Sequence, residues 1–354
     1  MMAKKRKTIA HREKARTNKV RESVAGYNPT LAVLYGQFVD SVYQMYEKYP
    51  GNPTPPALAL PAGYKLIAWV QMMDFIIVGG DWTFYGLIAQ STTDENNFVL
   101  AIRGTENLEE WFDDLTSTVL VPWENFGNVG YGFSRIYQTL RVVYAEILGS
   151  TTATHSFEPT STFAHQVAAT VQRHAVNVTA SSVAVTGHSL GAALATLYVA
   201  HTARNGLLST PLICTFASPR VGDPVFAAKF NQLGITSWRI INELDVVPKL
   251  PFLGFEHVQT VYSYNSGFSV IFSLGCLHSL TTYLHLLDLT QQLSDECRWP
   301  PMVAATAPLR RRVRPTKKAV ALSAQAEKDI AVSVPQDSDA TINITIKIGR
   351  TEEA

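Results

Sequence analysis

The chain has 354 residues, of which 46% are apolar and 17% are charged, and its formal net charge is +1. A chain of this length and apolar content buries a large core, so the composition excludes an intrinsically disordered protein. The charged fraction lies below the usual quarter, which is typical of a compact folded protein.

The basic residues gather near the two ends of the chain. Residues 1–22 hold nine Lys or Arg against two Glu, and residues 309–318 hold six Lys or Arg and no acid. We interpret residues 1–27 as a disordered basic tail. Residues 299–354 are interpreted as a Pro-rich basic linker and an extension, in which residues 341–348 alternate like an edge strand.

The segment between the tails, residues 28–298, is expected to fold as a single α/β domain. Residues 30–47 place apolar side chains at helical spacing, which predicts an amphipathic helix. Short strands separated by turn residues are then predicted over residues 61–70, 74–80, 83–90 and 97–104.

From about residue 132 the pattern changes to alternating helices and strands. This alternation indicates βαβ units and a mainly parallel sheet. Asp223 fits the N-cap of one of the helices, and Pro224 fits its first turn. The helices are predicted over residues 133–148, 162–175, 190–203, 224–233 and 279–290, and the strands over residues 181–186, 212–217 and 237–242.

Ser189 stands out because it lies between Gly187 and Gly191, after a predicted strand and before a helix rich in small residues. This is the context of the G-x-S-x-G elbow, in which a sharp turn holds a serine in a strained backbone conformation. Glycine is needed on both sides because a side chain would collide with the turn or with the neighbouring strand. The pattern therefore predicts that Ser189 is a nucleophile.

A nucleophilic serine needs an acid and a histidine base, which follow it in the order Ser, Asp or Glu, His in this type of fold. The acid is expected at the carboxyl end of a later strand. Asp245 comes three residues after the strand predicted over 237–242 and before Val-Val-Pro, whereas Glu243, two residues nearer the strand, is the alternative acid.

Three histidines follow this acid along the chain. His278 lies in a loop before the last predicted helix, where a base reaches across the top of the sheet, and we favour it as the base. His257 precedes a predicted strand and is the alternative, with a structural role. His285 falls inside the helix, where a packed or surface histidine is expected.

Acyl transfer also needs donors that stabilise an oxyanion. The backbone N–H of Leu190, directly after the nucleophile, is one candidate donor. The other is expected from the loop after an early strand, where Arg103, Gly104 and Thr105 turn sharply. Thr105 offers both its N–H and its hydroxyl.

Six segments occur in the order seen in the class 3 lipase family, the fungal lipase-like group of the α/β-hydrolases. The resemblance spans about residues 30–292, and the combination of G-H-S-L-G, P-R-V-G and D-x-V-P is highly specific. One departure is Gly130, where many members carry histidine. The segments are RGTENLEEWFDDL, VGYGF, VTGHSLGAALATL, TFASPRVGDPVF, INELDVVPKLP and CLHSLTTYL.

The resemblance implies an α/β-hydrolase fold with a mostly parallel sheet. It also implies that Ser189, Asp245 and His278 form a catalytic triad, and that Thr105 and Leu190 form the oxyanion hole. These assignments agree with the roles expected from the residues alone.

By the same resemblance, residues 106–115 form a lid. This lid follows the oxyanion turn, which is the turn at Arg103, Gly104 and Thr105. Trp111 and Phe112 would lie on the apolar side of this lid and contact substrate. Asp114 matches an acid that commonly supports the oxyanion loop in the family.

Together these features predict a serine carboxylic-ester hydrolase that cleaves fatty-acyl esters such as triacylglycerol at a lipid interface. A phospholipase A1 or a soluble carboxylesterase would use the same triad. An acyltransferase, or a non-enzymatic protein that binds surfaces through its basic tails, are alternatives of a different class. The mechanism requires no metal and no organic cofactor.

The sequence also carries expectations about partners and location. The basic tails are expected either to be solvated or to contact an anionic membrane, and no specific nucleic acid partner is expected. No signal peptide or membrane span is recognised, which favours a cytoplasmic or membrane-peripheral protein, although export by another route stays open. The three cysteines, an odd number without metal-like spacing, predict no disulfide scaffold.

Overall fold

The computed structural model describes most of the residues between the two tails, and they all lie in one compact unit. Several predictions fall outside these residues: both tails, the strand at 341–348, the strand at 74–80, and the lid over 106–115 with Trp111 and Phe112. The described residues are 26–48, 58–73, 82–105, 118–123, 125–144 and 161–299.

The described strands build one large sheet and one small one. The strands of the large sheet are β1 (Tyr64–Met73), β2 (Trp82–Ser91), β3 (Asn97–Ile102), β6 (Arg141–Tyr144), β7 (Ser182–His188), β8 (Leu212–Phe216), β9 (Thr236–Asn242) and β10 (Val261–Tyr264). The small sheet pairs β4 (Leu120–Pro122) with β5 (Asn128–Gly130).

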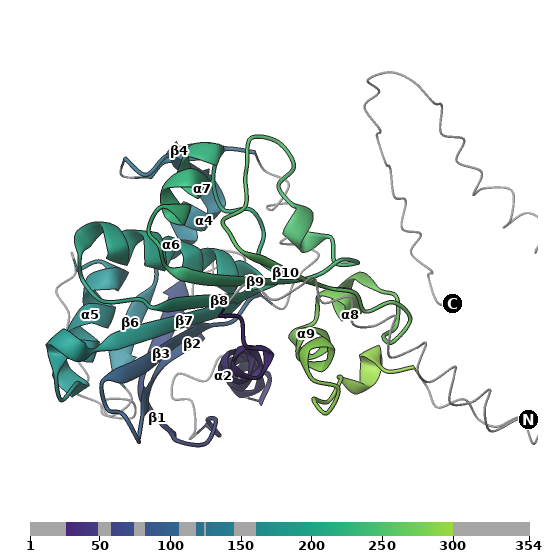
Figure 1. The fold of residues 1–354 in the computed structure, drawn as a ribbon, viewed down its shortest axis with the longest axis horizontal. Helices are drawn as coiled ribbons and strands as arrows, with labels where there is room; N and C mark the ends of the chain where they lie inside the picture. Colours follow the sequence, from purple (N-terminus) through teal and green to yellow (C-terminus); the bar gives the residue numbers. More distant parts are fainter. Residues whose placement is uncertain are drawn as a thin grey trace, which may run out of the picture. The chain divides into compact units, whose positions relative to one another are not determined.

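The large sheet has the order β10-β9-β8-β7-β3-β2-β1-β6 (Figure 1). The five strands from β10 to β3 run parallel, whereas β3, β2, β1 and β6 pair in antiparallel fashion. The predicted mainly parallel sheet is therefore confirmed for the five strands β10, β9, β8, β7 and β3. The carboxyl ends of these parallel strands share one edge, where open α/β sheets place their sites.

Helices cover both faces of the sheet. One face carries α2 and α9, and the other carries α4, α5 and α6 (Figure 1). The helices are α2 (Pro29–Lys48), α4 (Tyr131–Tyr137), α5 (Phe163–His174), α6 (Leu190–Asn205), α7 (Pro224–Asn231), α8 (Leu274–His278) and α9 (Leu280–Leu287). Short 3-10 turns are η2 (Val178–Ala180), η3 (Val247–Lys249) and η4 (Asp295–Cys297).

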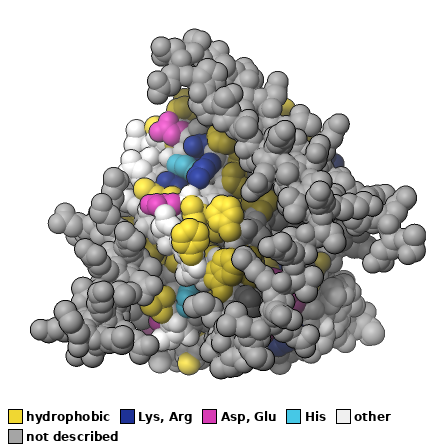
Figure 2. All heavy atoms as spheres, turned by 90° about the vertical axis from the view of Figure 1, so that its right-hand side faces the viewer, with side chains coloured by type: hydrophobic (Ala, Val, Ile, Leu, Met, Phe, Trp, Pro, Cys, Tyr) yellow, Lys and Arg dark blue, Asp and Glu magenta, His cyan; other side chains and the backbone are white. Residues whose placement is uncertain are grey.

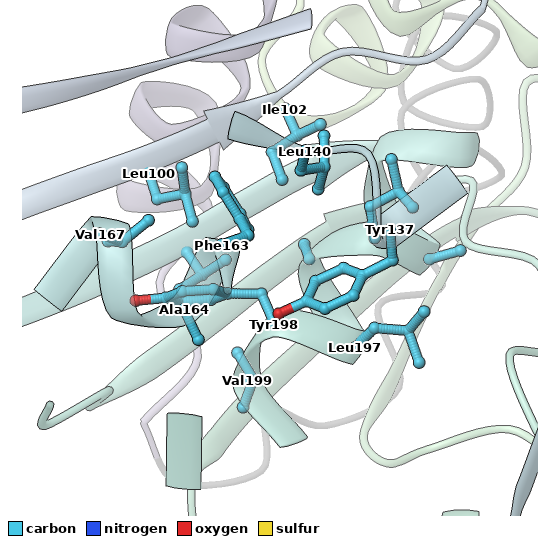
Figure 3. Close-up of a cluster of buried hydrophobic side chains, with 14 of the residues drawn as sticks. Leu100, Ile102, Tyr137, Leu140, Phe163, Ala164, Val167, Leu197, Tyr198 and Val199 are labelled. Atoms are coloured by element: carbon cyan, nitrogen blue, oxygen red, sulfur yellow. The ribbon is translucent and has the colours of Figure 1, made fainter. Parts of the chain in front are cut away.

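Two apolar layers hold these helices to the sheet. On one side, Phe38, Val42 and Met45 of α2 are buried, as the helical spacing predicted. On the other side, Phe163 of α5 and Tyr198 of α6 pack together beneath β3 (Figure 3). Burying each large apolar side chain stabilises the fold by roughly 1.5–3 kcal/mol. The two apolar layers thereby hold the sheet in place, together with the edge formed by the carboxyl ends of its parallel strands.

The helix predicted over residues 133–148 is wrong over residues 138–144, and residues 145–148 lie outside the described ranges. The helix α4 ends at Tyr137, and the chain then forms β6, which pairs with β1 at the edge of the sheet. Arg141 donates two hydrogen bonds to Gln71 of β1, at 2.9 and 2.7 Å, and its guanidinium lies over the ring of Trp82. Pairing with a distant strand overrides the local helical spacing here.

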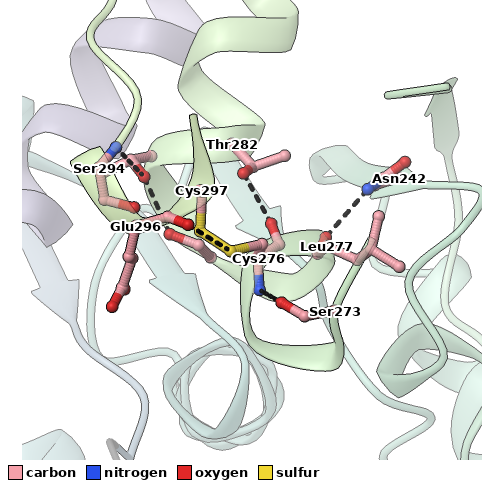
Figure 4. Close-up of a disulfide and its surroundings, with 10 residues drawn as sticks. Asn242, Ser273, Cys276, Leu277, Thr282, Ser294, Glu296 and Cys297 are labelled. Carbon is pink, nitrogen blue, oxygen red and sulfur yellow. Dashed lines mark hydrogen bonds between the residues drawn. A yellow bond between two sulfur atoms is a disulfide. The ribbon is translucent and has the colours of Figure 1, made fainter. Parts of the chain in front are cut away.

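The cysteine prediction also needs correction, because Cys276 and Cys297 form a disulfide (Figure 4). The chain after α9 returns to α8 and brings the two Cα atoms to 5.2 Å across a separation of 21 residues. Neither the odd cysteine count nor the spacing signals this return. Cys214 is buried and free within the described part of the chain.

No helix in the described ranges combines the length and the apolar character needed to cross a bilayer.

Candidate active site

Ser189 occupies a tight corner between β7 and α6. Its backbone has φ 55° and ψ −123°, a conformation that an L-residue adopts only under strain. A Cβ on Gly187 would collide with the backbone of Gly191, and one on Gly191 would collide with the carbonyl of Ile102. Both glycines are therefore required by packing, which is the elbow geometry expected from the sequence.

Asp245 and His278 meet in the buried interior of the site. His278 Nδ1 donates a hydrogen bond to Asp245 Oδ2 at 2.7 Å, and both side chains are buried. The hydroxyl of Tyr283 donates to the same oxygen at 2.7 Å, and the N–H of Val247 donates to Oδ1 at 3.0 Å. These three donors hold the carboxylate in place, so the proton of His278 sits on Nδ1 and Nε2 is left as a base.

The alternative acid lies in a different setting. Glu243 is exposed, and its carboxylate accepts hydrogen bonds from Ser263 at 3.2 Å and from Asn265 at 2.8 Å. Such a solvated carboxylate has no histidine to orient. The position of Asp245 is therefore the one that suits the acid of a triad.

The two alternative histidines are also placed elsewhere. His257 donates through Nε2 to the carbonyl of Pro248, and burial together with the nearby Arg239 lowers its pKa to about 3. His285 donates through Nδ1 to the carbonyl of Gln291 at 2.8 Å, at the end of α9. His278 is thus the histidine that contacts Asp245, although it is the last residue of the short helix α8 and not in a loop as predicted.

Three buried polar atoms at the site lack a hydrogen-bond partner among the residues that the structure describes. They are Arg103 Nη2, Ser189 Oγ and His278 Nε2. Unpaired buried polar atoms are uncommon, and a role in chemistry is one explanation for them. Ser189 Oγ and His278 Nε2 are the two atoms between which a proton would pass in acyl transfer.

The expected oxyanion donors lie beside the elbow. Leu190 is the first residue of α6, where backbone N–H groups have no partner within the helix. Gly104 packs so closely on the elbow that a Cβ there would lie 2.8 Å from Ser189 Cβ. Thr105, the next residue, is half-buried and ends a described range. The roles of Thr105 and Leu190 stay predictions.

Four further residues of the site carry no assigned role in the sequence prediction. Arg103 is buried between the rings of Tyr46 and Tyr85, at 3.8 and 3.9 Å from their centroids. It donates to the carbonyls of Phe84 at 3.2 Å and of Gly104 at 2.8 Å, which shapes the turn formed by Arg103, Gly104 and Thr105.

The other three are Tyr283, His188 and Tyr43. The sequence could have indicated His188, because it stands inside the G-H-S-L-G motif. It could also have indicated Tyr283, which follows His278 by five residues. Tyr43 carries no such local signal, because it lies on α2 and reaches His188 only in the folded chain.

The site lies in a part of the chain that matches a known protein family. Residues 99–255, which include the elbow and Asp245, match the family described as Lipase (class 3). This part of the chain belongs to the class 3 lipase family. The resemblance that the motifs indicated is thereby confirmed.

Curated relatives include plant and fungal enzymes. Phospholipase A(1) DAD1, chloroplastic, of Arabidopsis thaliana is 27% identical over 270 residues, which cover 63% of this chain and 56% of that protein. Phospholipase A1-II 4 of Oryza sativa subsp. japonica is 28% identical over 239 residues, covering 60% and 57%. A lipase of Rhizomucor miehei is 31% identical over 173 residues, covering 48% and 42%. The chain therefore spans little more than half the length of these two plant relatives.

Among solved structures, a deletion mutant of the Rhizomucor miehei lipase–propeptide complex superposes with a TM-score of 0.50. The match is 21% identical in sequence and covers 79% of this chain and 82% of that one. At this identity the likeness is one of fold. The described domain therefore shares the fold of this lipase, the α/β-hydrolase fold that the sequence predicted.

Proposed function

We propose that this protein is a serine carboxylic-ester hydrolase that acts on fatty-acyl esters. The observation that carries the proposal is the His278–Asp245 hydrogen bond beside the strained elbow of Ser189. Membership of the class 3 lipase family and the names of the relatives support the same chemistry.

The reaction follows from the positions of these groups. Ser189 Oγ attacks the ester carbonyl while His278 Nε2 accepts its proton, and Asp245 holds the imidazole in the correct tautomer. The N–H of Leu190 and the donors of Thr105 stabilise the oxyanion. His278 then gives its proton to the leaving alcohol, and water releases the fatty acid from Ser189 in a second cycle.

The surroundings of the site favour a lipid substrate over a small soluble ester. Phe252 and Leu253 are 66% and 75% exposed on the loop after β9, and Phe268 and Phe272 are 90% and 69% exposed on the loop after β10. Both loops leave the sheet at the edge where Ser189 lies. Figure 2 shows apolar side chains gathered on this face next to basic ones. Exposed apolar surface beside a site is typical of contact with lipid.

Triacylglycerol is the substrate expected from the sequence, and a phospholipid is the alternative. The names of the two plant relatives, both phospholipases A1, favour the alternative. The same triad and the same exposed aromatic residues would serve either substrate. The chemistry of the polar head, and not of the acyl group, separates the two.

The test compares three substrates with the purified full chain: emulsified triolein, phosphatidylcholine vesicles and p-nitrophenyl butyrate. We expect fatty acid release from at least one of the two lipids, faster than butyrate release, and the faster lipid identifies the substrate. Ser189→Ala serves as the control and should lose hydrolysis of all three. A wild-type protein without ester hydrolysis, or an active Ser189→Ala variant, would contradict the proposal.

A further inference from the structure

A chain of three hydrogen bonds crosses the candidate site. The N–H of Gly104 donates to Tyr43 Oη at 2.8 Å, Tyr43 Oη lies 2.8 Å from His188 Nδ1, and His188 Nε2 lies 2.8 Å from the carbonyl oxygen of His278. The residues belong to the oxyanion turn, α2, β7 and α8. The chain therefore joins four segments that are far apart in the sequence.

The chemistry of the acceptors fixes the direction of every bond. The carbonyl oxygen of His278 is only an acceptor, so His188 Nε2 must carry a proton. In the neutral imidazole His188 Nδ1 is then an acceptor, and the hydroxyl of Tyr43 must donate to it. The oxygen of Tyr43 in turn accepts from Gly104. All three bonds run from the oxyanion turn towards the base.

Burial keeps His188 in the neutral state that this chain needs. Its side chain is 3% exposed. Burial, and next the nearby His278, hold the pKa of His188 well below its usual value, although the hydrogen bond to the His278 carbonyl opposes this. The two rings lie 4.8 Å apart between centroids. A neutral His188 therefore adds no like charge next to the imidazolium that forms on His278 during proton transfer.

We propose that Tyr43 and His188 are positioning residues that hold the oxyanion turn, the nucleophile and the base at a fixed spacing. The proposal rests on the ester hydrolysis proposed above. The chain touches three reacting groups: Gly104 at one end precedes Thr105, His188 in the middle precedes Ser189, and the other end is the carbonyl of His278 itself. Packing allows little slack, since a Cβ on Gly104 would lie 2.6 Å from Tyr43 Oη.

This role differs in its kinetics from a purely structural one. Oxyanion donors and the base interact most strongly with the transition state, so a loss of their spacing lowers kcat and leaves KM nearly unchanged. A buried network that only stabilises the fold would change the unfolding temperature without changing kcat per folded molecule. The ratio of the two effects therefore separates the roles.

The first test is Tyr43→Phe, which removes the donor to His188 and the acceptor of Gly104 while it keeps the ring. We expect kcat for p-nitrophenyl butyrate to fall about tenfold, the rate equivalent of one net hydrogen bond, with KM within about twofold of the wild type. Tyr35→Phe removes a hydroxyl from the same helix outside this chain of bonds and should keep the wild-type kcat. An unchanged kcat in folded Tyr43→Phe would overturn the proposal.

The second test concerns the link between His188 and the base. His188→Gln keeps an N–H that donates to the His278 carbonyl, whereas His188→Ala does not. We expect the glutamine variant to retain clearly more kcat than the alanine variant at matched unfolding temperature. Equal losses in the two folded variants would show that the hydrogen bond does not position the base.

A spectroscopic measurement tests the direction of the bonds without any activity. In ¹⁵N NMR of the histidine side chains, we expect His188 to be neutral with its proton on Nε2 at pH 7, with His188→Gln identifying the signal. A proton on Nδ1, or an imidazolium, would overturn the proposal. A wild-type protein that cleaves no ester, by contrast, would contradict the proposed function, so the two failures are distinguishable.

Discussion

At the scale of single residues, the site depends on buried polar groups that are held by side-chain and backbone hydrogen bonds. Asp245 is 1% exposed and is held by one imidazole, one phenol and one backbone N–H. A carboxylate at this depth is tolerated only with such donors. His257, by contrast, is a buried group that is held in its neutral form. It lies near Arg239 and donates to the carbonyl of Pro248.

His257 should therefore make the fold sensitive to acid. Its pKa is about 3 in the folded protein and about 6.5 when unfolded, so below pH 6.5 the unfolded chain binds more protons and stability falls as the pH falls. His257→Gln should remove this contribution. Chemical unfolding at pH 7 and pH 5 should show that the wild type loses about 2 kcal/mol more than the variant. Equal losses would mean that His257 titrates normally.

How far the site could be predicted differs from residue to residue. Ser189, Asp245 and His278 each follow a strand or precede a helix in a fixed order, so local patterns identify them before any contact is known. Their catalytic roles stay predictions. Tyr43 lies 145 positions from His188 along the chain, and their contact depends on how α2 packs on the sheet. No local pattern encodes that packing.

At the scale of elements, the short helix α8 positions His278, the proposed base. The side chain of Ser273 caps its N-terminus by accepting from the N–H of Cys276, and the disulfide ties Cys276 to Cys297 (Figure 4). The carbonyl of Leu277 accepts from the side chain of Asn242 on β9 at 2.9 Å. Three attachments therefore anchor a helix of five residues that is too short to be stable alone.

Removing the disulfide should weaken this anchor. Cross-linking across 21 residues restricts the unfolded chain, so Cys297→Ala should lower the free energy of unfolding by about 3 kcal/mol, measured by chemical denaturation. Reductant should destabilise the wild type by a similar amount and leave the variant unchanged. A wild type that responds to reductant no more than the variant does would refute the contribution of this bond.

The predicted bounds of an element agree best with the observed bounds where one face of the element, or the whole element, is buried. The amphipathic α2 and the buried β7 lie within two residues of their predicted bounds. By contrast, β6 is an edge strand of four residues, and its pairing with β1 is set by a distant partner. The disulfide depends in the same way on a return of the chain after α9. Long-range contacts, and not local spacing, decide these features.

At the scale of the whole molecule, exposed apolar side chains lie at both ends of the sheet. Phe268 is 90% exposed on a loop at the edge that carries Ser189. Val176 is 74% exposed between α5 and β7, at the amino end of the strand whose carboxyl end leads to Ser189. The two residues thus mark opposite ends of the sheet and form a matched pair.

If the proposed lipid substrate is correct, Phe268→Ser should weaken binding to lipid emulsion by about tenfold or more, because burying an aromatic side chain contributes roughly 1.5–3 kcal/mol. Hydrolysis of soluble p-nitrophenyl butyrate should stay unchanged, because the side chain is exposed in the free protein. Val176→Ser is the control and should alter neither. Equal binding by the two variants in a flotation assay would contradict the placement of the lipid surface.

The central claim is that Ser189 is the nucleophile of an acyl-transfer site. The most direct measurement is mass spectrometry of the intact chain and its peptides after reaction with an alkyl phosphonate ester, which traps an activated serine as a covalent adduct. The account predicts one adduct per chain, on the peptide that carries Ser189, and none on Ser189→Ala. An adduct on another serine, or no adduct on a folded wild-type protein, would contradict it.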